Sequence, residues 1–152
     1  MPLAATSLER MAVEDVASVR ALLVEGLKEH WGHYDPKFNP DLEDFPSFYQ
    51  DSVILVAKSG SSVVGVGILQ PENAENAKIV RMSVSAEARR MGVGSRILGG
   101  LLAAARQQGF RNIGLETTAS WKSAVEFYKV HGFVPTHVQN GDQYFSYAAS
   151  EA

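Results

Sequence analysis

The feature that most constrains this chain is the stretch from Lys78 to Phe110, in which an apolar run, a polar connection containing glycines and an amphipathic segment follow one another. Ile79, Val80, Met82 and Val84 form a run typical of a strand. From Val93 onward the large apolar residues follow the spacing of a helix. The residues that share one helical face are Ile97, Leu98, Leu101, Leu102 and Ala105. The stretch therefore predicts a strand, a glycine loop and a helix.

Gly92 and Gly94 stand where this helix is expected to begin. A helix start leaves backbone N–H groups unpaired and carries the positive end of the helix dipole. Glycine lets an anion approach the backbone closely, and Arg89 and Arg90 add positive charge at the same place. The sequence therefore predicts a phosphate-binding loop.

Two common phosphate-binding motifs do not fit the loop. The dinucleotide fingerprint G-x-G-x-x-G has isoleucine, Ile97, where its third glycine belongs, although Glu116 lies 22 positions after Gly94 and mimics the ribose-binding acid. The P-loop also fails, because no Gly-Lys-Ser/Thr follows. An ordinary glycine turn before a core helix remains the simplest alternative for these six residues alone.

Composition limits the class of protein. A chain of 152 residues that is 45% hydrophobic and 20% charged is suited to one globular domain, which we expect to span residues 1–152. The net charge of −3 does not favour nucleic acid or an anionic membrane as a partner. The absence of cysteine excludes disulfides, thiolate metal sites and a cysteine nucleophile. We expect no membrane span and no targeting segment, and a cytoplasmic location.

The rest of the chain predicts a mixed α/β fold. The first half suggests a strand over 7–12, a helix ending near His30, a loop with one short helix from Pro46, and a hairpin of strands over 52–58 and 62–69. After the central helix we expect a strand over 112–117, a helix capped by Ser120 and ended by Gly132, and a second hairpin over 133–148. This order describes a mixed sheet of about seven strands with helices on both faces, of the α/β (α+β mixed) class.

Two motifs and this order of elements resemble one known family. Arg89 to Gly94 resembles the R/Q-x-x-G-x-G/A pyrophosphate loop of the GNAT superfamily, the Gcn-related N-acetyltransferases that use acetyl-CoA. Ala124 to Phe133 resembles the family's A-x-x-x-Y-x-x-x-G-F. The resemblance covers residues 5 to 148 and implies a GNAT-like fold. One departure is Trp121, which stands where the family often has an asparagine that contacts the cofactor.

The resemblance implies how acetyl-CoA would be held. The strand residues Met82, Ser83 and Val84 would align the acetyl and pantetheine portions, with the Met82 amide as an oxyanion donor. Backbone amides of the loop would hold the pyrophosphate with help from Arg89. The remaining loop residues expected at this site are Arg90, Met91, Gly92, Val93, Gly94 and Ser95. The indole of Trp121 would pack on pantetheine or close the acceptor pocket.

Amide formation also requires proton transfers. By resemblance, Tyr128 is the candidate acid for the departing thiolate, and a core position on an apolar helical stripe is the alternative. Glu116 is the candidate base for the amine, against a surface or salt-bridged glutamate. His30, His33 and Asp35 have a spacing that could suggest a metal site, but helix-end and loop polarity explains them more simply, and we expect no metal.

The resemblance thus implies an N-acetyltransferase that moves the acetyl group of acetyl-CoA to a primary amine of a small molecule or peptide by direct attack. The acids from Asp41 to Asp51 could attract the amine, and the aromatics from Trp31 to Tyr49 could wall its pocket. Alternatively, the segment forms a solvated charged loop with its aromatics in the core. A homodimer is one arrangement that we consider. The alternative function is a non-catalytic acyl-CoA-binding module on the same fold.

Overall fold

The computed structural model describes residues 6–149, which form one sheet covered by helices. The strands are β1 (Thr6–Arg10), β2 (Val53–Ser59), β3 (Ser62–Pro71), β4 (Asn76–Val84), β5 (Asn112–Thr118), β6 (Val134–Gln139) and β7 (Asp142–Ala148). The helices are α1 (Val16–Trp31), α2 (Pro40–Glu43), α3 (Phe45–Phe48), α4 (Val93–Gln107) and α5 (Lys122–Val130).

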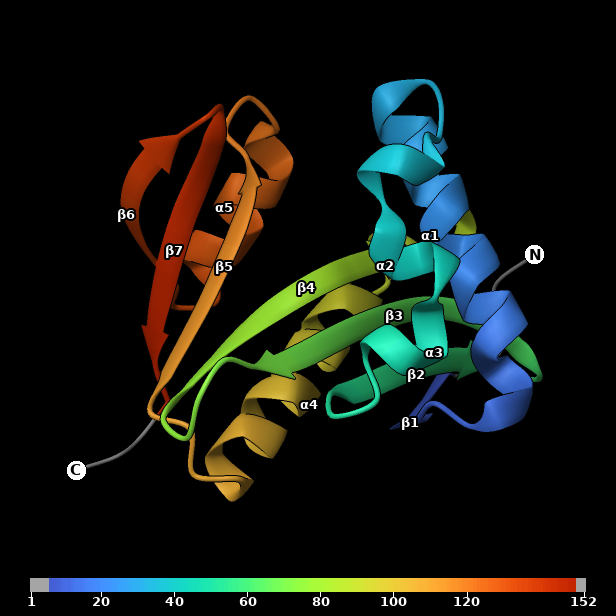
Figure 1. Ribbon diagram of the computed structural model, residues 1–152, viewed down its shortest axis with the longest axis horizontal. Helices are drawn as coiled ribbons and strands as arrows, with labels where there is room; N and C mark the ends of the chain where they lie inside the picture. The colour runs from blue at the N-terminus through green and yellow to red at the C-terminus, as the bar shows by residue number, and fades with distance from the viewer. Residues whose placement is uncertain (1–5, 150–152) are drawn as a thin grey trace.

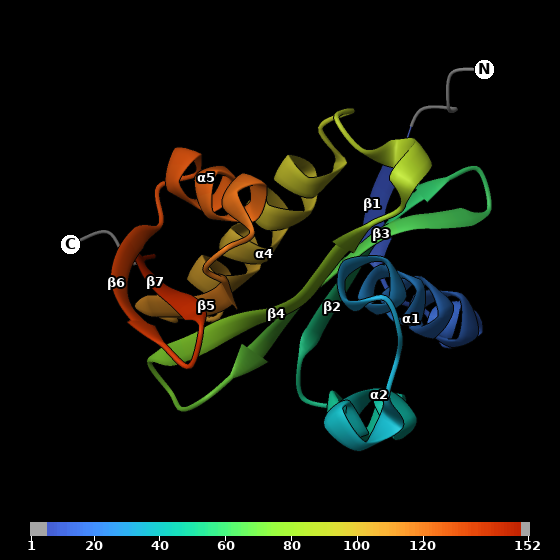
Figure 2. The ribbon, with the colours of Figure 1, turned by 90° about the horizontal axis from the view of Figure 1, so that it is seen from above.

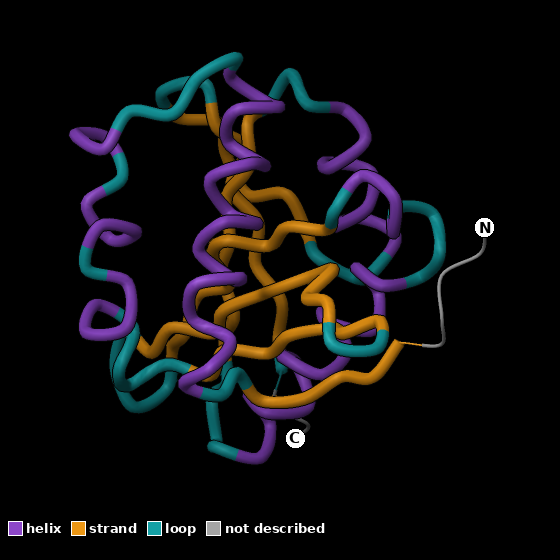
Figure 3. Tube along the Cα trace, turned by 90° about the vertical axis from the view of Figure 1, so that its right-hand side faces the viewer, coloured by secondary structure: helices purple, strands orange, loops and turns teal. Residues whose placement is uncertain are grey.

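The seven strands lie in the order β1-β2-β3-β4-β5-β7-β6, and all neighbours are antiparallel except β4 and β5. Helices α1, α2 and α3 cover one face, and α4 and α5 cover the other (Figures 1 and 2). Helical segments therefore lie on both sides of the strands (Figure 3). The predicted mixed sheet with helices on both faces is confirmed. None of the helices in residues 6–149 is long and apolar enough to cross a membrane.

The two faces of the sheet bury separate apolar clusters. On one face, the α4 stripe predicted from the sequence is buried, with Ile97, Leu98 and Leu101 fully inaccessible. Helix α4 can approach β3 because a side chain at Gly67 would lie 2.7 Å from Ile97 and 2.9 Å from Leu101. On the other face α1 and the short helices bury a second cluster. The apolar face of α4 that its helical spacing predicted is therefore the face that packs against the sheet.

Some predicted boundaries were wrong. The first strand ends at Arg10 rather than residue 12. Segment 31–51 contains two short α-helices rather than one: α2 begins at Pro40, and α3 begins at Phe45, one residue before the expected Pro46. Helix α5 begins at Lys122 with Trp121, not Ser120, at the N-cap. The Trp121 amide is held in a turn by the Thr118 carbonyl at 3.0 Å, which delays the helix.

Strands β4 and β5 pair only at their first residues, Asn76–Lys78 against Asn112–Gly114. Strand β4 begins at Asn76, two residues before the stretch singled out in the sequence, because Asn76 and Ala77 pair with β5 and Ala77 also pairs with β3. Beyond it the strands separate, while β5 pairs with β7 along its whole length. The sheet therefore opens into two arms, visible in the middle of Figure 1.

Strand β4 contains a bulge where this separation begins. Its register against β3 passes from Val66–Ser83 to Ile68–Val80, so Arg81 and Met82 both oppose Gly67. Arg81 has φ 54°, in the left-handed region, which costs a residue other than glycine about 1–3 kcal/mol. Val80 packs in the α1 cluster and Met82 against the α4 cluster, and Arg81 reaches Asp41 beside the α1 cluster. The alternation of the strand is thus interrupted by one residue.

Candidate functional site

The N-terminus of α4 offers unpaired backbone donors. Arg90 and Gly92 have φ of 63° and 80°, and such turns of the backbone form concavities that bind anions. Among the described residues, no acceptor is found for the amide N–H groups of residues 90 to 95. A side chain at Gly94 would meet only ordinary contacts, the nearest being the Phe127 ring at 3.5 Å. The geometry therefore supports the predicted anion site.

Two side chains beside this helix start are held by other residues. Arg89 forms an ion pair with Glu29 of α1, and both side chains are about half exposed. The Ser95 hydroxyl lies 2.9 Å from Nε2 of His131, whose Nδ1 lies 2.8 Å from the Phe127 carbonyl. Because a carbonyl can only accept, Nδ1 carries a hydrogen, and in the neutral ring Nε2 accepts from Ser95. The start of α4 is therefore tied to both α1 and the end of α5.

A cleft of about 690 Å³ fills the opening between β4 and β5. Its walls come from α1, the two strands and α5, and it reaches Arg89 and Gly94 at the start of α4. Tyr128 of α5 also lines it, although only 9% of this residue is exposed. The cleft therefore joins the anion site to a buried tyrosine.

Tyr128 is held by rings but not by a polar partner. Its ring contacts Phe127, Phe133 and Phe145, with centroids 5.1, 5.9 and 6.0 Å away. Among the described residues, none forms a hydrogen bond with its hydroxyl. Burial raises the pKa of Tyr128 to about 12. The hydroxyl therefore stays protonated at neutral pH and remains free to donate.

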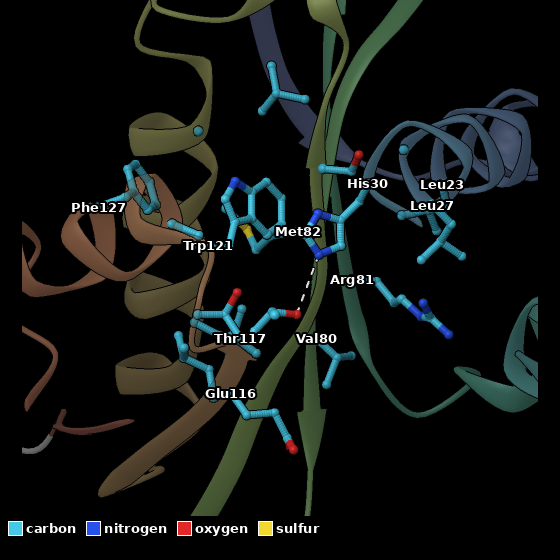
Figure 4. Close-up of a pocket in the computed structure, with 18 of the residues that line it drawn as sticks. Leu23, Leu27, His30, Val80, Arg81, Met82, Glu116, Thr117, Trp121 and Phe127 are labelled. Carbon is cyan, nitrogen blue, oxygen red and sulfur yellow. Dashed lines mark hydrogen bonds between the residues drawn. The ribbon is translucent and has the colours of Figure 1, made fainter. Parts of the chain in front are cut away.

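Trp121 and His30 meet in the middle of the opening (Figure 4). Their rings are stacked, with centroids 4.3 Å apart and an interplanar angle of 24°. The His30 Nε2 also lies 3.4 Å from the Thr118 hydroxyl, a long hydrogen bond. Because His30 is on α1 and Trp121 precedes α5, the stack connects the two arms of the sheet.

Glu116 lies on the β5 wall and is already paired. The Lys78 ammonium donates to its carboxylate at 2.7 Å, and both side chains are 31% exposed. Burial alone would raise the pKa of Glu116, but hydrogen bonds from Lys78 and Tyr144 outweigh it and hold the pKa below its usual 4.5. The group is a carboxylate at neutral pH, and it is a weaker base than a free glutamate.

The comparisons with known proteins agree with this geometry. The sequence model described as the Acetyltransferase (GNAT) family matches residues 16–133. The chain belongs to the GNAT acetyltransferase family.

Other members resemble the chain in sequence or in fold. It is 32% identical over 124 residues to N-acetyltransferase 8B of Rattus norvegicus and 29% identical over 127 residues to N-acetyltransferase 8F1 of Mus musculus. These matches cover 76% and 78% of this chain but 54% and 55% of the relatives, so the chain spans about half their length.

Solved GNAT structures share the fold. A GNAT acetyltransferase from Staphylococcus aureus Mu50 has a TM-score of 0.84 at 18% identity, covering 96% of this chain and all of that one. The PaiA N-acetyltransferase from Thermoplasma acidophilum, solved in complex with coenzyme A, has a TM-score of 0.83 at 15% identity, covering 95% and 99%.

The cleft of this GNAT chain brings together most of the residues expected from the sequence. Those that line it are Met82, Ser83, Val84, Arg89, Gly94, Glu116, Trp121 and Tyr128. The expected loop residues Arg90, Met91, Gly92, Val93 and Ser95 lie in or next to the same turn but do not line the cleft.

The three residues considered for a metal site do not line one common pocket. His33 and Asp35 line a separate hollow of about 340 Å³, while His30 turns into the main cleft. Within residues 6–149, no group of histidines and acids is placed to hold a metal ion. Of the acids in segment 31–52, Asp41 is buried against Arg81.

Two residues of the cleft were not assigned a role at this site from the sequence. His30 was considered only as a metal ligand. The helical spacing of α1 places it one turn after Gly26 and Leu27, on the helix face that lines the cleft. Arg81 interrupts an otherwise apolar strand, and a charge at such a position indicates a buried partner.

Proposed function

We propose that this chain is an acetyl-CoA-dependent N-acetyltransferase that acts on a primary amine of a small molecule or peptide. The observation that carries the proposal is the single cleft that runs from the free amides at the start of α4 to the Tyr128 hydroxyl between the separated strands. Membership of the GNAT family and the coenzyme A bound to a protein of the same fold support it.

In this proposal the start of α4 binds the pyrophosphate of acetyl-CoA. Gly94 leaves room for an anion, and the backbone amides of residues 90 to 95 donate to its oxygens. Arg89 adds charge when it exchanges Glu29 for the pyrophosphate. The pantetheine arm would then follow β4 into the cleft, past Trp121.

The chemistry needs no side-chain nucleophile. The amine nitrogen attacks the thioester carbon directly, and the Met82 amide donates to the oxygen as negative charge develops. The C–S bond then breaks, the amine loses a proton to Glu116, directly or through water, and Tyr128 donates a proton to the departing sulfur. The products are an amide and free coenzyme A.

The Trp121–His30 stack would form the boundary between cofactor and acceptor. Its indole is 45% exposed in the cleft and presents an apolar surface to pantetheine or to the acceptor. A cytoplasmic location, a homodimer and the extent of the domain over residues 1–152 stay predictions.

The test is to mix the purified chain with acetyl-CoA and a panel of amines and peptides and to follow free thiol. We expect at least one amine to release thiol faster than hydrolysis does, with an acetylated product seen by mass spectrometry. If coenzyme A binds but no amine exceeds hydrolysis, the chain is a non-catalytic acyl-CoA-binding module and the proposal is wrong.

A further inference from the structure

Arg81 is the residue of β4 that departs most from strand geometry. It has a left-handed backbone, φ 54°, at the bulge where β4 has lost its one-to-one pairing with β3. Bulges redirect the chain and are frequent beside active sites. The next residue is Met82, whose amide we assign to the oxyanion. A conformation that is unfavourable for arginine therefore precedes the proposed donor directly.

The side chain of Arg81 makes a clamp that holds this conformation. Its Nε donates to Asp41 at 2.8 Å and its Nη2 donates to the other Asp41 oxygen at 2.7 Å, in a two-pronged contact. Nη2 also donates to the Asn39 side-chain oxygen at 3.0 Å. Figure 4 shows Arg81 extending from β4 away from the Trp121–His30 stack.

The clamp also stabilises the buried carboxylate of Asp41. It is 7% exposed, and the Tyr49 hydroxyl donates to it at 2.6 Å. A buried carboxylate without a cation is costly, so the pair holds segment 39–49 against β4. The clamp therefore joins the short helices beside the cleft to the strand that carries the proposed oxyanion donor.

We propose that Arg81 is a positioning residue of this site: its clamp on Asp41 keeps the bulge of β4 in the left-handed conformation and thereby fixes the backbone of Met82, which lines the cleft, for its role as oxyanion donor. This inference rests on the proposed function. Without the clamp, the backbone at residue 81 relaxes toward a regular strand, and the peptide between residues 81 and 82 rotates. A small displacement of such a donor lowers turnover without removing the cofactor site.

Glycine and alanine at position 81 separate the backbone from the side chain. Both remove the clamp, but glycine adopts positive φ freely whereas alanine does not. We expect Arg81→Ala to lower kcat by at least about tenfold per folded molecule, and Arg81→Gly to keep at least about threefold more kcat than alanine does. The calorimetric affinity for coenzyme A should change by less than about threefold, because the start of α4 is untouched.

Arg20 provides the matched control. It holds the same segment from α1, donating to the Leu42 carbonyl at 2.9 Å and to Glu43 at 2.7 Å, but it makes no bond to β4. Arg20→Ala should therefore keep the wild-type kcat. Equal kcat for the alanine and glycine variants at position 81, or wild-type kcat in both, overturns the proposal.

Two more conservative substitutions test the same clamp if the Arg81→Ala variant does not fold. Arg81→Lys keeps the charge but loses the two-pronged contact, and Asp41→Asn keeps the shape but loses the charge. Both should lower kcat more than they lower the folded fraction. Full kcat in both variants contradicts the proposal.

Amide hydrogen exchange tests the clamp even if the proposed function fails. Arg81→Ala should speed exchange in both 76–84 and 39–49, whereas Arg20→Ala should affect only 39–49. A wild-type chain that acetylates no amine but shows this pattern refutes the function and leaves the clamp standing. Unchanged exchange in Arg81→Ala refutes the clamp itself.

Discussion

The replacement Tyr128→Phe tests the mechanism at its most buried group. It removes one oxygen and leaves the ring contacts with Phe127, Phe133 and Phe145 in place. A hydrogen bond typically stabilises a fold by about 0.5–1.5 kcal/mol, but this hydroxyl has no acceptor among the described residues. We therefore expect the free energy of unfolding at pH 7 to change by less than about 0.5 kcal/mol.

Turnover should respond more strongly than stability. General acid catalysis contributes about 10²- to 10⁴-fold, and its efficiency rises as the pKa of the acid approaches the working pH. Because burial raises the pKa of Tyr128 to about 12, far above the working pH, we expect a fall in kcat at or below the lower limit of this range, about 10- to 100-fold. The affinity for coenzyme A should stay unchanged, since Tyr128 lies away from the amides that would bind the pyrophosphate.

The raised pKa also predicts a stability difference at alkaline pH. An unfolded tyrosine ionises near 10.0 while folded Tyr128 stays protonated up to about 12, so the stability that it contributes is complete below pH 10 and is lost between these values. At pH 11 the loss is on the order of 1 kcal/mol, and Tyr128→Phe does not suffer it. Other tyrosines titrate equally in both proteins and cancel in the comparison.

Urea unfolding at pH 7, 9 and 11 and thiol release at pH 7 should be measured on the same preparations. Wild-type kcat in a folded Tyr128→Phe variant would refute the assignment of the acid. An alkaline stability difference of zero would show instead that the hydroxyl is more hydrated than its burial indicates.

The remaining predictions concern the cofactor site and the base. Gly94→Glu should reduce coenzyme A affinity by at least about 100-fold, because it adds a negative charge among the phosphate-binding amides. Gly94→Ala is the control, since its methyl group meets only ordinary contacts and should leave the fold intact. Equal calorimetric affinity for Gly94→Glu and wild type would exclude this loop. Trp121→Ala should raise the KM for acetyl-CoA or for the acceptor about 5- to 50-fold by removing the surface stacked on His30, and unchanged kinetics would make Trp121 a structural residue. If Glu116 is the base, kcat should fall at least about tenfold in Glu116→Gln. Because the Lys78 and Tyr144 hydrogen bonds lower the pKa of Glu116, the decrease of wild-type kcat at acid pH that is due to Glu116 should lie below pH 4.5. A decrease of kcat near neutral pH that is unchanged in Glu116→Gln would assign the base to another group.

Local spacing was sufficient to predict most of the elements and the glycine turn at the start of α4. The period of the apolar residues placed α4, and the glycines with their neighbouring arginines marked its start as an anion site. These predictions depend only on residues within one or two turns of each other, because helical and strand periods are local properties. The two motifs, in order and at their spacing, identified the family, and Tyr128 of the second motif lines the cleft.

Contacts between distant residues were decided only by the tertiary structure. Arg81 reaches Asp41, 40 positions away, and Lys78 reaches Glu116, 38 positions away, so neither pair leaves a local pattern in the sequence. The same holds for the stack of His30 on Trp121. Glu116 could therefore be named as a base from the sequence, whereas the ammonium that lowers its pKa could not.

The cleft itself is a result of sheet pairing. A strand pattern in the sequence does not show where two strands stop pairing, and β4 and β5 pair only over Asn76–Lys78 and Asn112–Gly114. The bulge at Arg81 and the full pairing of β5 with β7 separate the remainder. The sequence by itself determined which elements form and which side chains they carry, because those depend on local period and residue type. The opening between the arms depends on how whole strands pair and pack, and only the folded chain fixes it.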